Sequence, residues 1–150
     1  MNKEKITFTL LCSFISSLIG KLGIPFIILI TANIVDYITA FIVCYIQGTK
    51  FTSYKSFKGI AKKILMWLLV VVGAIVDITI THYTTLVGQP TTLRYVIANL
   101  VAFWLVCNEL ISIIENIAGT GVAVPKFLQK IIKATQTKIE ESANDNTNTK

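Results

Sequence analysis

The chain has 150 residues, of which 53% are apolar and 15% are charged, and its formal net charge at pH 7 is +6. A soluble domain of this length needs a charged surface, so this composition excludes an ordinary soluble protein and favours one membrane-embedded domain. The basic residues stand in blocks beside apolar segments. This arrangement predicts an anionic lipid bilayer as a partner and no nucleic acid.

The first apolar segment, residues 6–19, follows two lysines and has no evident small-residue cleavage site after it. As a helix it is about 21 Å long. Because the hydrocarbon core is roughly 30 Å thick, this is short for a complete span. We expect a retained, short apolar helix that is interfacial, re-entrant or a fourth span, and the sequence leaves these three placements open.

Three longer apolar segments follow, at about residues 24–46, 64–81 and 95–117. With a rise of about 1.5 Å per residue, each covers most or all of the hydrocarbon core as a helix. A basic connection, residues 47–63, separates the first two, and residues 82–94 carry the turn signal Gly88-Gln89-Pro90 before the third. We therefore predict an all-α membrane protein with three transmembrane helices in a single domain, residues 1–140.

Residues 126–140 set apolar side chains against lysines at helical spacing. This pattern predicts a basic amphipathic tail helix that lies on an anionic leaflet, although a solvated tail is equally compatible with it. Residues 141–150 are polar and are expected to be disordered. The candidate membrane-surface residues of the tail and of the basic connection are Lys50, Lys55, Lys58, Lys62, Lys63, Lys126, Lys130 and Lys133.

The distribution of basic residues also predicts the orientation of the chain in its membrane. Residues 47–63 carry five lysines and no acid, whereas residues 82–94 carry Arg94 and the ambiguous His82. Since loops rich in Lys and Arg stay in the cytoplasm, the first connection and the C-terminus are expected inside and the second connection outside.

Four acidic residues lie in apolar stretches that contain no Lys or Arg. An acid at that depth is costly and marks an interior face or a hydrated path. Steps of three and four residues collect polar side chains beside these acids on one face of each span. The candidate pore-lining or interhelical polar residues are Asn33, Asp36, Asp77, Asn108, Glu109, Ser112, Glu115 and Asn116.

Two interpretations of these acids remain open. They form interhelical hydrogen bonds as protonated carboxyls, or they line a hydrated path. Because no cation partner is present in the same stretches, we favour a lining role for Glu109, and interhelical packing for the deeper Asp36.

The sequence offers little for other kinds of site. Cys12, Cys44 and Cys107 lie in apolar surroundings, so no disulfide is expected. One histidine and three scattered cysteines have no metal-ligand spacing. No nucleophile and base are arranged for catalysis. We expect no metal, no cofactor and no enzymatic activity.

Several segments resemble the toxin-secretion and phage-lysis holins, including the holin encoded beside large clostridial toxins. They are residues 36–40 (DYITA), the basic residues 53–63, Asp77, and residues 108–116 (NELISIIEN) followed by 121–128 (GVAVPKFL). The last block is the most specific, and the resemblance covers residues 23–133. Ala40 departs from the family, which often has Gly there, so a close helix crossing at this position is in doubt.

This resemblance implies a holin, a protein that self-associates in the bacterial cytoplasmic membrane and opens lesions at a set time. The implied partners are other copies of the chain and, indirectly, a released cargo, either a phage cell-wall hydrolase or a large clostridial-type toxin. Two alternatives remain: a small acid-lined ion or proton channel, and an accessory membrane subunit whose acids only hold helices together. Leakage of large solutes, of ions alone, or of neither separates the three.

Overall fold

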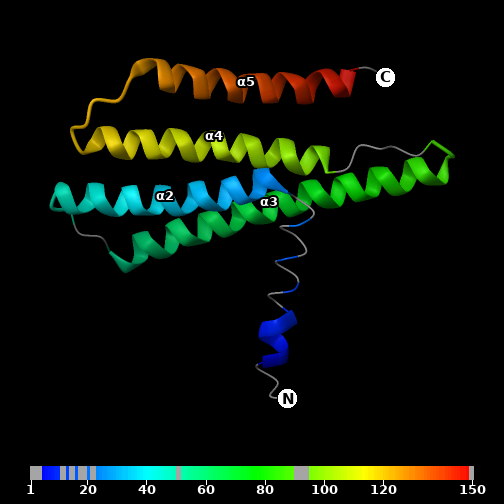
Figure 1. Cartoon of the computed structure of the whole chain (residues 1–150), viewed down its shortest axis with the longest axis horizontal. Coiled ribbons are helices and arrows are strands. Elements are labelled where there is room, and N and C mark those ends of the chain that lie inside the picture. The colour runs from blue at the N-terminus through cyan, green and yellow to red at the C-terminus, as the bar shows by residue number, and fades with distance from the viewer. Residues whose placement is uncertain are drawn as a thin grey trace.

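The computed structural model describes residues 5–10, 13, 16, 20, 23–49, 52–89 and 95–148, among which no strand occurs. Figure 1 labels the four main helices: α2 (Ile24–Ile46), α3 (Ser53–Leu86), α4 (Val96–Gly119) and α5 (Lys126–Asn148). Three of them, α2, Ser56–Leu86 of α3, and α4, are long and apolar enough to cross a membrane. For the described residues, the prediction of an all-helical chain with three membrane-length helices is confirmed.

Only part of the expected N-terminal helix, residues 6–19, is described. Residues 5–10 are helical, as are the single positions 13, 16 and 20. The remaining positions of this segment lie outside the described residues, so its placement in the membrane stays a prediction.

Helix α3 is longer than the expected span, residues 64–81. It begins at Ser53 inside the expected basic connection and continues to Leu86. The Ser56 N–H donates to the Thr52 carbonyl at 3.1 Å, so the hydrogen bonding between residues four apart, which defines an α-helix, begins at the first turn of α3. Lysine and alanine favour helices, and here they extend the transmembrane helix into the basic segment. Helix α3 therefore includes residues 53–63 of the predicted basic connection as well as the predicted apolar span.

Helix α5 is also longer than predicted. The tail helix was expected to end at residue 140 and to be followed by disorder, but α5 extends to Asn148. Elongating an existing helix costs far less than nucleating one, so a polar, exposed sequence is able to continue it. The Ser142 hydroxyl donates to the Lys138 carbonyl at 2.8 Å, one turn earlier in the same helix.

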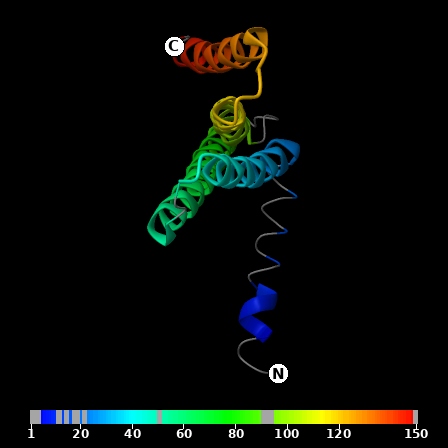
Figure 2. The same ribbon diagram turned by 90° about the vertical axis from the view of Figure 1, so that its left-hand side faces the viewer.

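Helix α4 lies at the centre of the fold and packs against α2, α3 and α5. Figures 1 and 2 show α5 running along one side of α4, with α2 and α3 on the other side. Helices α2 and α4 point the same way, while α3 and α5 run in the opposite direction. The C-terminal part of α3 extends beyond the N-terminal ends of α2 and α4 (Figure 1).

Small residues allow α3 and α4 to approach closely. A Cβ atom added at Gly73 of α3 would lie 2.9 Å from the Cα atom of Ala98 in α4, so only glycine fits there. The core around this crossing is apolar, and close packing of small residues is the usual way in which membrane helices associate. Its buried members are Phe26, Leu29, Val70, Ala74, Ala98, Ala102, Leu105 and Val106.

Candidate functional site

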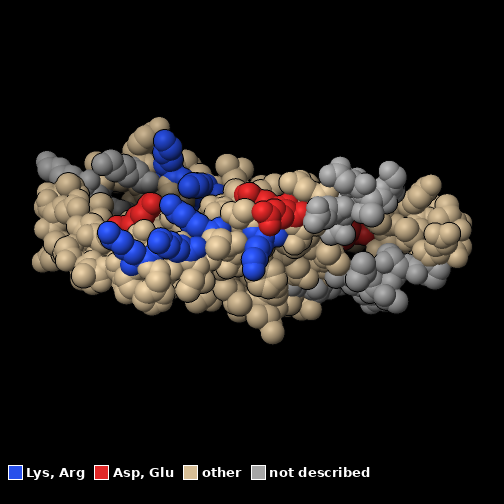
Figure 3. Space-filling view, turned by 90° about the horizontal axis from the view of Figure 1, so that it is seen from above, with Lys and Arg blue, Asp and Glu red and all other residues tan. Residues whose placement is uncertain are grey.

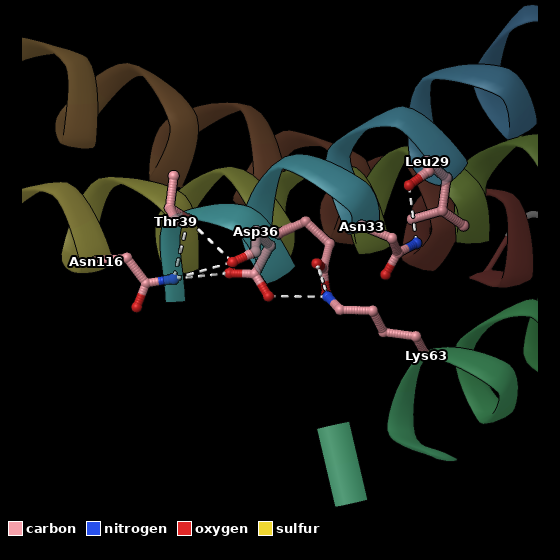
Figure 4. A network of polar contacts seen from close by, with 7 residues as sticks. Leu29, Asn33, Asp36, Thr39, Lys63 and Asn116 are labelled. Carbon is pink, nitrogen blue, oxygen red and sulfur yellow. Dashed lines mark hydrogen bonds and ion pairs between the residues drawn. The ribbon is translucent and has the colours of Figure 1, made fainter. Parts of the chain in front are cut away.

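The main polar site lies where α2, α3 and α4 meet, and Lys63 is at its centre (Figure 4). The Lys63 Nζ atom donates to the Asp36 carboxylate of α2 at 2.8 Å and also to the Glu109 carboxylate of α4. The side chains of Lys63 and Asp36 are each 14% exposed, and that of Glu109 is 5% exposed. One ammonium group therefore joins three helices through two largely buried ion pairs.

Asn116 and Thr39 complete this cluster on the α4 and α2 sides. The Asn116 amide donates to Asp36 Oδ1 at 3.1 Å and to the Thr39 hydroxyl at 3.2 Å. The Thr39 hydroxyl in turn donates to the Asp36 carbonyl at 2.9 Å. Each charged group thus has at least one close partner, as buried charges require.

The position of Lys63 corrects two expectations. It was assigned to the membrane surface, and the acids of the spans were expected to have no cation partner. Because α3 starts at Ser53, Lys63 lies on the helix face that continues through Trp67 and Val70 into the core. This spacing of four and three residues was the signal in the sequence that identifies Lys63 as an inward-facing residue.

Asp77 has a different role at the other end of the bundle. Its carboxylate accepts from the backbone N–H groups of Ile97 at 3.0 Å and of Ala98 at 2.8 Å, in the first turn of α4. These N–H groups have no partner within their own helix, and the N-terminal end of a helix favours negative charge. Asp77, which is buried, therefore caps α4 from α3.

Asn33 borders a groove between α2 and α3. Its amide donates to the Leu29 carbonyl at 2.8 Å (Figure 4), while its Oδ1 atom is buried and has no hydrogen-bond partner in the described chain. The Nε1 atom of Trp67, across the groove, is likewise unpaired among the described residues. The groove has a volume of about 340 Å³ and is otherwise mainly apolar.

The remaining polar residues of α4 lie outside the Lys63 cluster. Asn108 accepts from the Gln136 amide of α5 at 3.0 Å. Ser112 is half-buried, and Glu115 is exposed without an ion pair among the described residues. The predicted polar face of α4 is thus divided, with Glu109 and Asn116 facing α2 and α3, and Asn108 facing α5.

Helix α5 covers the far side of α4. Ile132 is buried together with Cys107 and Ile114, and the Trp104 Nε1–H donates to the Glu140 carboxylate at 2.7 Å. Trp104, Gln136 and Glu140 were not singled out in the sequence, since a contact between two separate helices has no local signal. In Figure 3 basic side chains gather on the face of the molecule above α5.

The other basic candidates divide according to exposure. The side chains of Lys58, Lys62, Lys126, Lys130 and Lys133 are exposed. Lys50 lies outside the described residues, and only the backbone of Lys55 is described. In the described part of the chain, no group of three His, Cys, Asp or Glu side chains is placed to hold a metal ion.

These features define a small helical membrane protein with three membrane-length helices joined by an internal ion-pair cluster. The family model of the bacteriophage holin family matches residues 13–137. The chain therefore belongs to the bacteriophage holin family.

Relatives come from several bacteria. An uncharacterized protein of Listeria monocytogenes is 33% identical over 116 residues, which cover 77% of this chain and 74% of the relative. An uncharacterized protein of Halalkalibacterium halodurans is 31% identical over 128 residues, 85% of this chain and 90% of the relative. A protein of Clostridium perfringens described as an uncharacterized 14.9 kDa protein in the nagH 3' region is 28% identical over 114 residues, 76% of this chain and 78% of the relative. No solved structure matches the chain significantly.

Proposed function

We propose that this protein is a holin that self-associates in the bacterial cytoplasmic membrane and opens lesions that release a cytoplasmic cargo. The match to the holin family over residues 13–137 carries this proposal. The cargo is a phage cell-wall hydrolase or a large clostridial-type toxin. We propose no enzymatic activity and no cofactor.

The ion-pair cluster favours a holin over a narrow acid-lined channel. Asp36 and Glu109 are paired with Lys63 between helices of one protomer, so these two carboxylates act as internal links in the structure. The same cluster makes the three-helix unit a defined building block for assembly. Exposed apolar side chains on all three membrane-length helices are available for contact with lipid and with further copies.

Induction of the chain in a bacterium tests this proposal. We expect growth arrest, loss of membrane potential, and release of a large cytoplasmic reporter enzyme into the medium. An unrelated three-span protein at the same membrane level serves as the control. Loss of potential without enzyme release would indicate a channel instead, and absence of both would indicate an accessory subunit.

The proposed orientation places the C-terminus in the cytoplasm. A cysteine at Ser142 in a cysteine-free chain should resist a membrane-impermeant thiol reagent in intact cells before lysis. A matched cysteine at Thr85, in the last turns of α3, should react from outside. Labelling at Ser142 together with protection at Thr85 would reverse the topology.

A further inference from the structure

The contacts between α4 and α5 fix the depth at which α5 lies beside a membrane-length helix. Gln136 bonds to Asn108 at 3.0 Å, and Glu140 bonds to Trp104 at 2.7 Å. Toward the other end of α5, Ile132 packs with Cys107 and Ile114. The two helices therefore run antiparallel and in contact along much of their length (Figure 1).

Asn108 is near the middle of α4, which extends from Val96 to Gly119. A helix of this length covers about 36 Å and so crosses a hydrocarbon core of roughly 30 Å. Gln136, its partner, consequently lies near mid-depth when α5 is packed on α4. Lys133 and Lys138 are within one helical turn of Gln136, and they share this depth.

The outer face of α5 is charged along its length, and Lys133 and Lys138 lie at that depth. Over residues 126–144 the exposed charged side chains of this face are four lysines and one glutamate, while the exposed Glu140 is bonded to Trp104 of α4. In Figure 3, blue side chains (Lys and Arg) gather on the face above α5, with red patches (Asp and Glu) on both sides of the main blue group. Charged side chains surrounded by hydrocarbon are strongly unfavourable, and no described residue forms an ion pair with these five. The outer-face residues are Lys126, Lys130, Lys133, Lys138 and Glu141.

The packed arrangement therefore requires water on the outer side of α5 while α4 crosses the membrane. We propose that, once a lesion opens, the α4–α5 hairpin lines its aqueous lumen, with the lysine-rich face of α5 toward the water. The C-terminal end of α5 then lies beside the N-terminal end of α4, whereas the proposed orientation before lysis places the C-terminus in the cytoplasm. This inference rests on the proposed holin function and identifies the surface that passing solutes meet. Since lysines outnumber glutamates on this face, the lumen attracts anions and acidic segments of a cargo protein.

Helix α4 separates this lumen from the Lys63 cluster. Cys107 and Ile114 face α5, whereas Glu109 and Asn116 face α2 and α3. The residues that line the lumen are thus those of the amphipathic tail. Asp36 and Glu109 lie on the opposite side of α4, where their ion pairs with Lys63 join α2, α3 and α4. The apolar surfaces of α2 and α3 remain available to lipid.

A reversible cross-link between α4 and α5 tests the arrangement. Asn108→Cys and Gln136→Cys are introduced in a chain without its native cysteines, and a short bis-methanethiosulfonate reagent joins them in lipid vesicles. We expect the cross-linked protein to release an entrapped enzyme at least half as fast as the reduced protein. Release by the reduced form together with more than tenfold slower release by the cross-linked form would overturn the lumen assignment. Absence of release from both forms would contradict the proposed holin function itself.

Ion selectivity gives a second test. If α5 had only a structural role, charge changes on its outer face would not alter the selectivity. In planar bilayers under a KCl gradient, we expect openings of the unmodified chain to prefer chloride over potassium. Lys133→Glu with Lys138→Glu should shift the reversal potential toward potassium. Lys62→Glu, an equally exposed change on α3, should leave it unaltered. Equal reversal potentials for the unmodified chain and the α5 variant would refute the inference.

Discussion

Replacement of Lys63 by methionine removes the single ammonium group that two carboxylates share. Methionine keeps most of the length and volume of the side chain, so packing against Trp67 and the core is largely retained. What changes is the charge: Asp36 and Glu109 remain in a site where their side chains are only 14% and 5% exposed. The substitution therefore isolates the electrostatic contribution of Lys63.

The expected loss of stability is large. Removal of one partner from a buried ion pair costs about 3–5 kcal/mol, because the other charge is left without compensation. Asp36 keeps its hydrogen bond from Asn116 at 3.1 Å, whereas the Glu109 side chain has no other hydrogen-bond or ion-pair partner among the described residues. We therefore expect Lys63→Met to lower the free energy of unfolding by about 3–5 kcal/mol, mainly through Glu109.

The structure also predicts an asymmetry between the lysine and its partners. With two carboxylates for one ammonium, Glu109→Gln leaves Lys63 paired with Asp36 and removes the excess negative charge. We expect this variant to lose no more than about 1 kcal/mol. The charge-free combination of Lys63→Met, Asp36→Asn and Glu109→Gln should recover most of the stability lost by Lys63→Met alone, because no unpaired charge remains.

The assay is unfolding of the purified protein in mixed micelles titrated with SDS, followed by tryptophan fluorescence. Lys62→Met is the matched control, since its side chain is exposed next to Lys63 in the sequence, and it should stay within about 0.5 kcal/mol of the unmodified chain. The reasoning would be refuted if Lys63→Met were as stable as this control, or if the charge-free combination were as unstable as the single variant.

Two further substitutions test the packing of α3 against α4. Gly73→Ala places a Cβ atom 2.9 Å from the Ala98 backbone and should cost about 1–3 kcal/mol in the same assay, whereas Gly59→Ala meets nothing within 4 Å and should be neutral or slightly stabilising. Asp77→Ala leaves the backbone N–H groups of Ile97 and Ala98, in the first turn of α4, without an acceptor. This change should lower the free energy of unfolding by about 1–3 kcal/mol. Thr79→Val, an exposed change on the same helix, should alter stability by less than about 0.5 kcal/mol, and an equal loss in both variants would argue against the cap.

The sequence by itself determined the class of protein and the number of membrane-length helices. Apolar runs longer than the hydrocarbon core and lysine blocks beside them are local features, so no knowledge of packing was needed to find them. The bounds of α2 coincide with the expected residues 24–46, and those of α4 differ from the expected 95–117 by two residues or fewer. Periodicity likewise indicated the amphipathic character of residues 126–140.

Only the tertiary structure decided which polar groups meet. Lys63 bonds to carboxylates 27 and 46 residues away in the chain, and its role changes from surface contact to interhelical link because α3 starts earlier than the apolar run. Asp77 caps a helix that begins 19 residues later, which no pattern within α3 reveals. The placement of α5 along α4 depends on hydrogen bonds between the two helices, from Trp104 to Glu140 and from Gln136 to Asn108. Hydropathy and spacing identify the helices, whereas the pairing of their faces depends on shape and charge complementarity between distant segments.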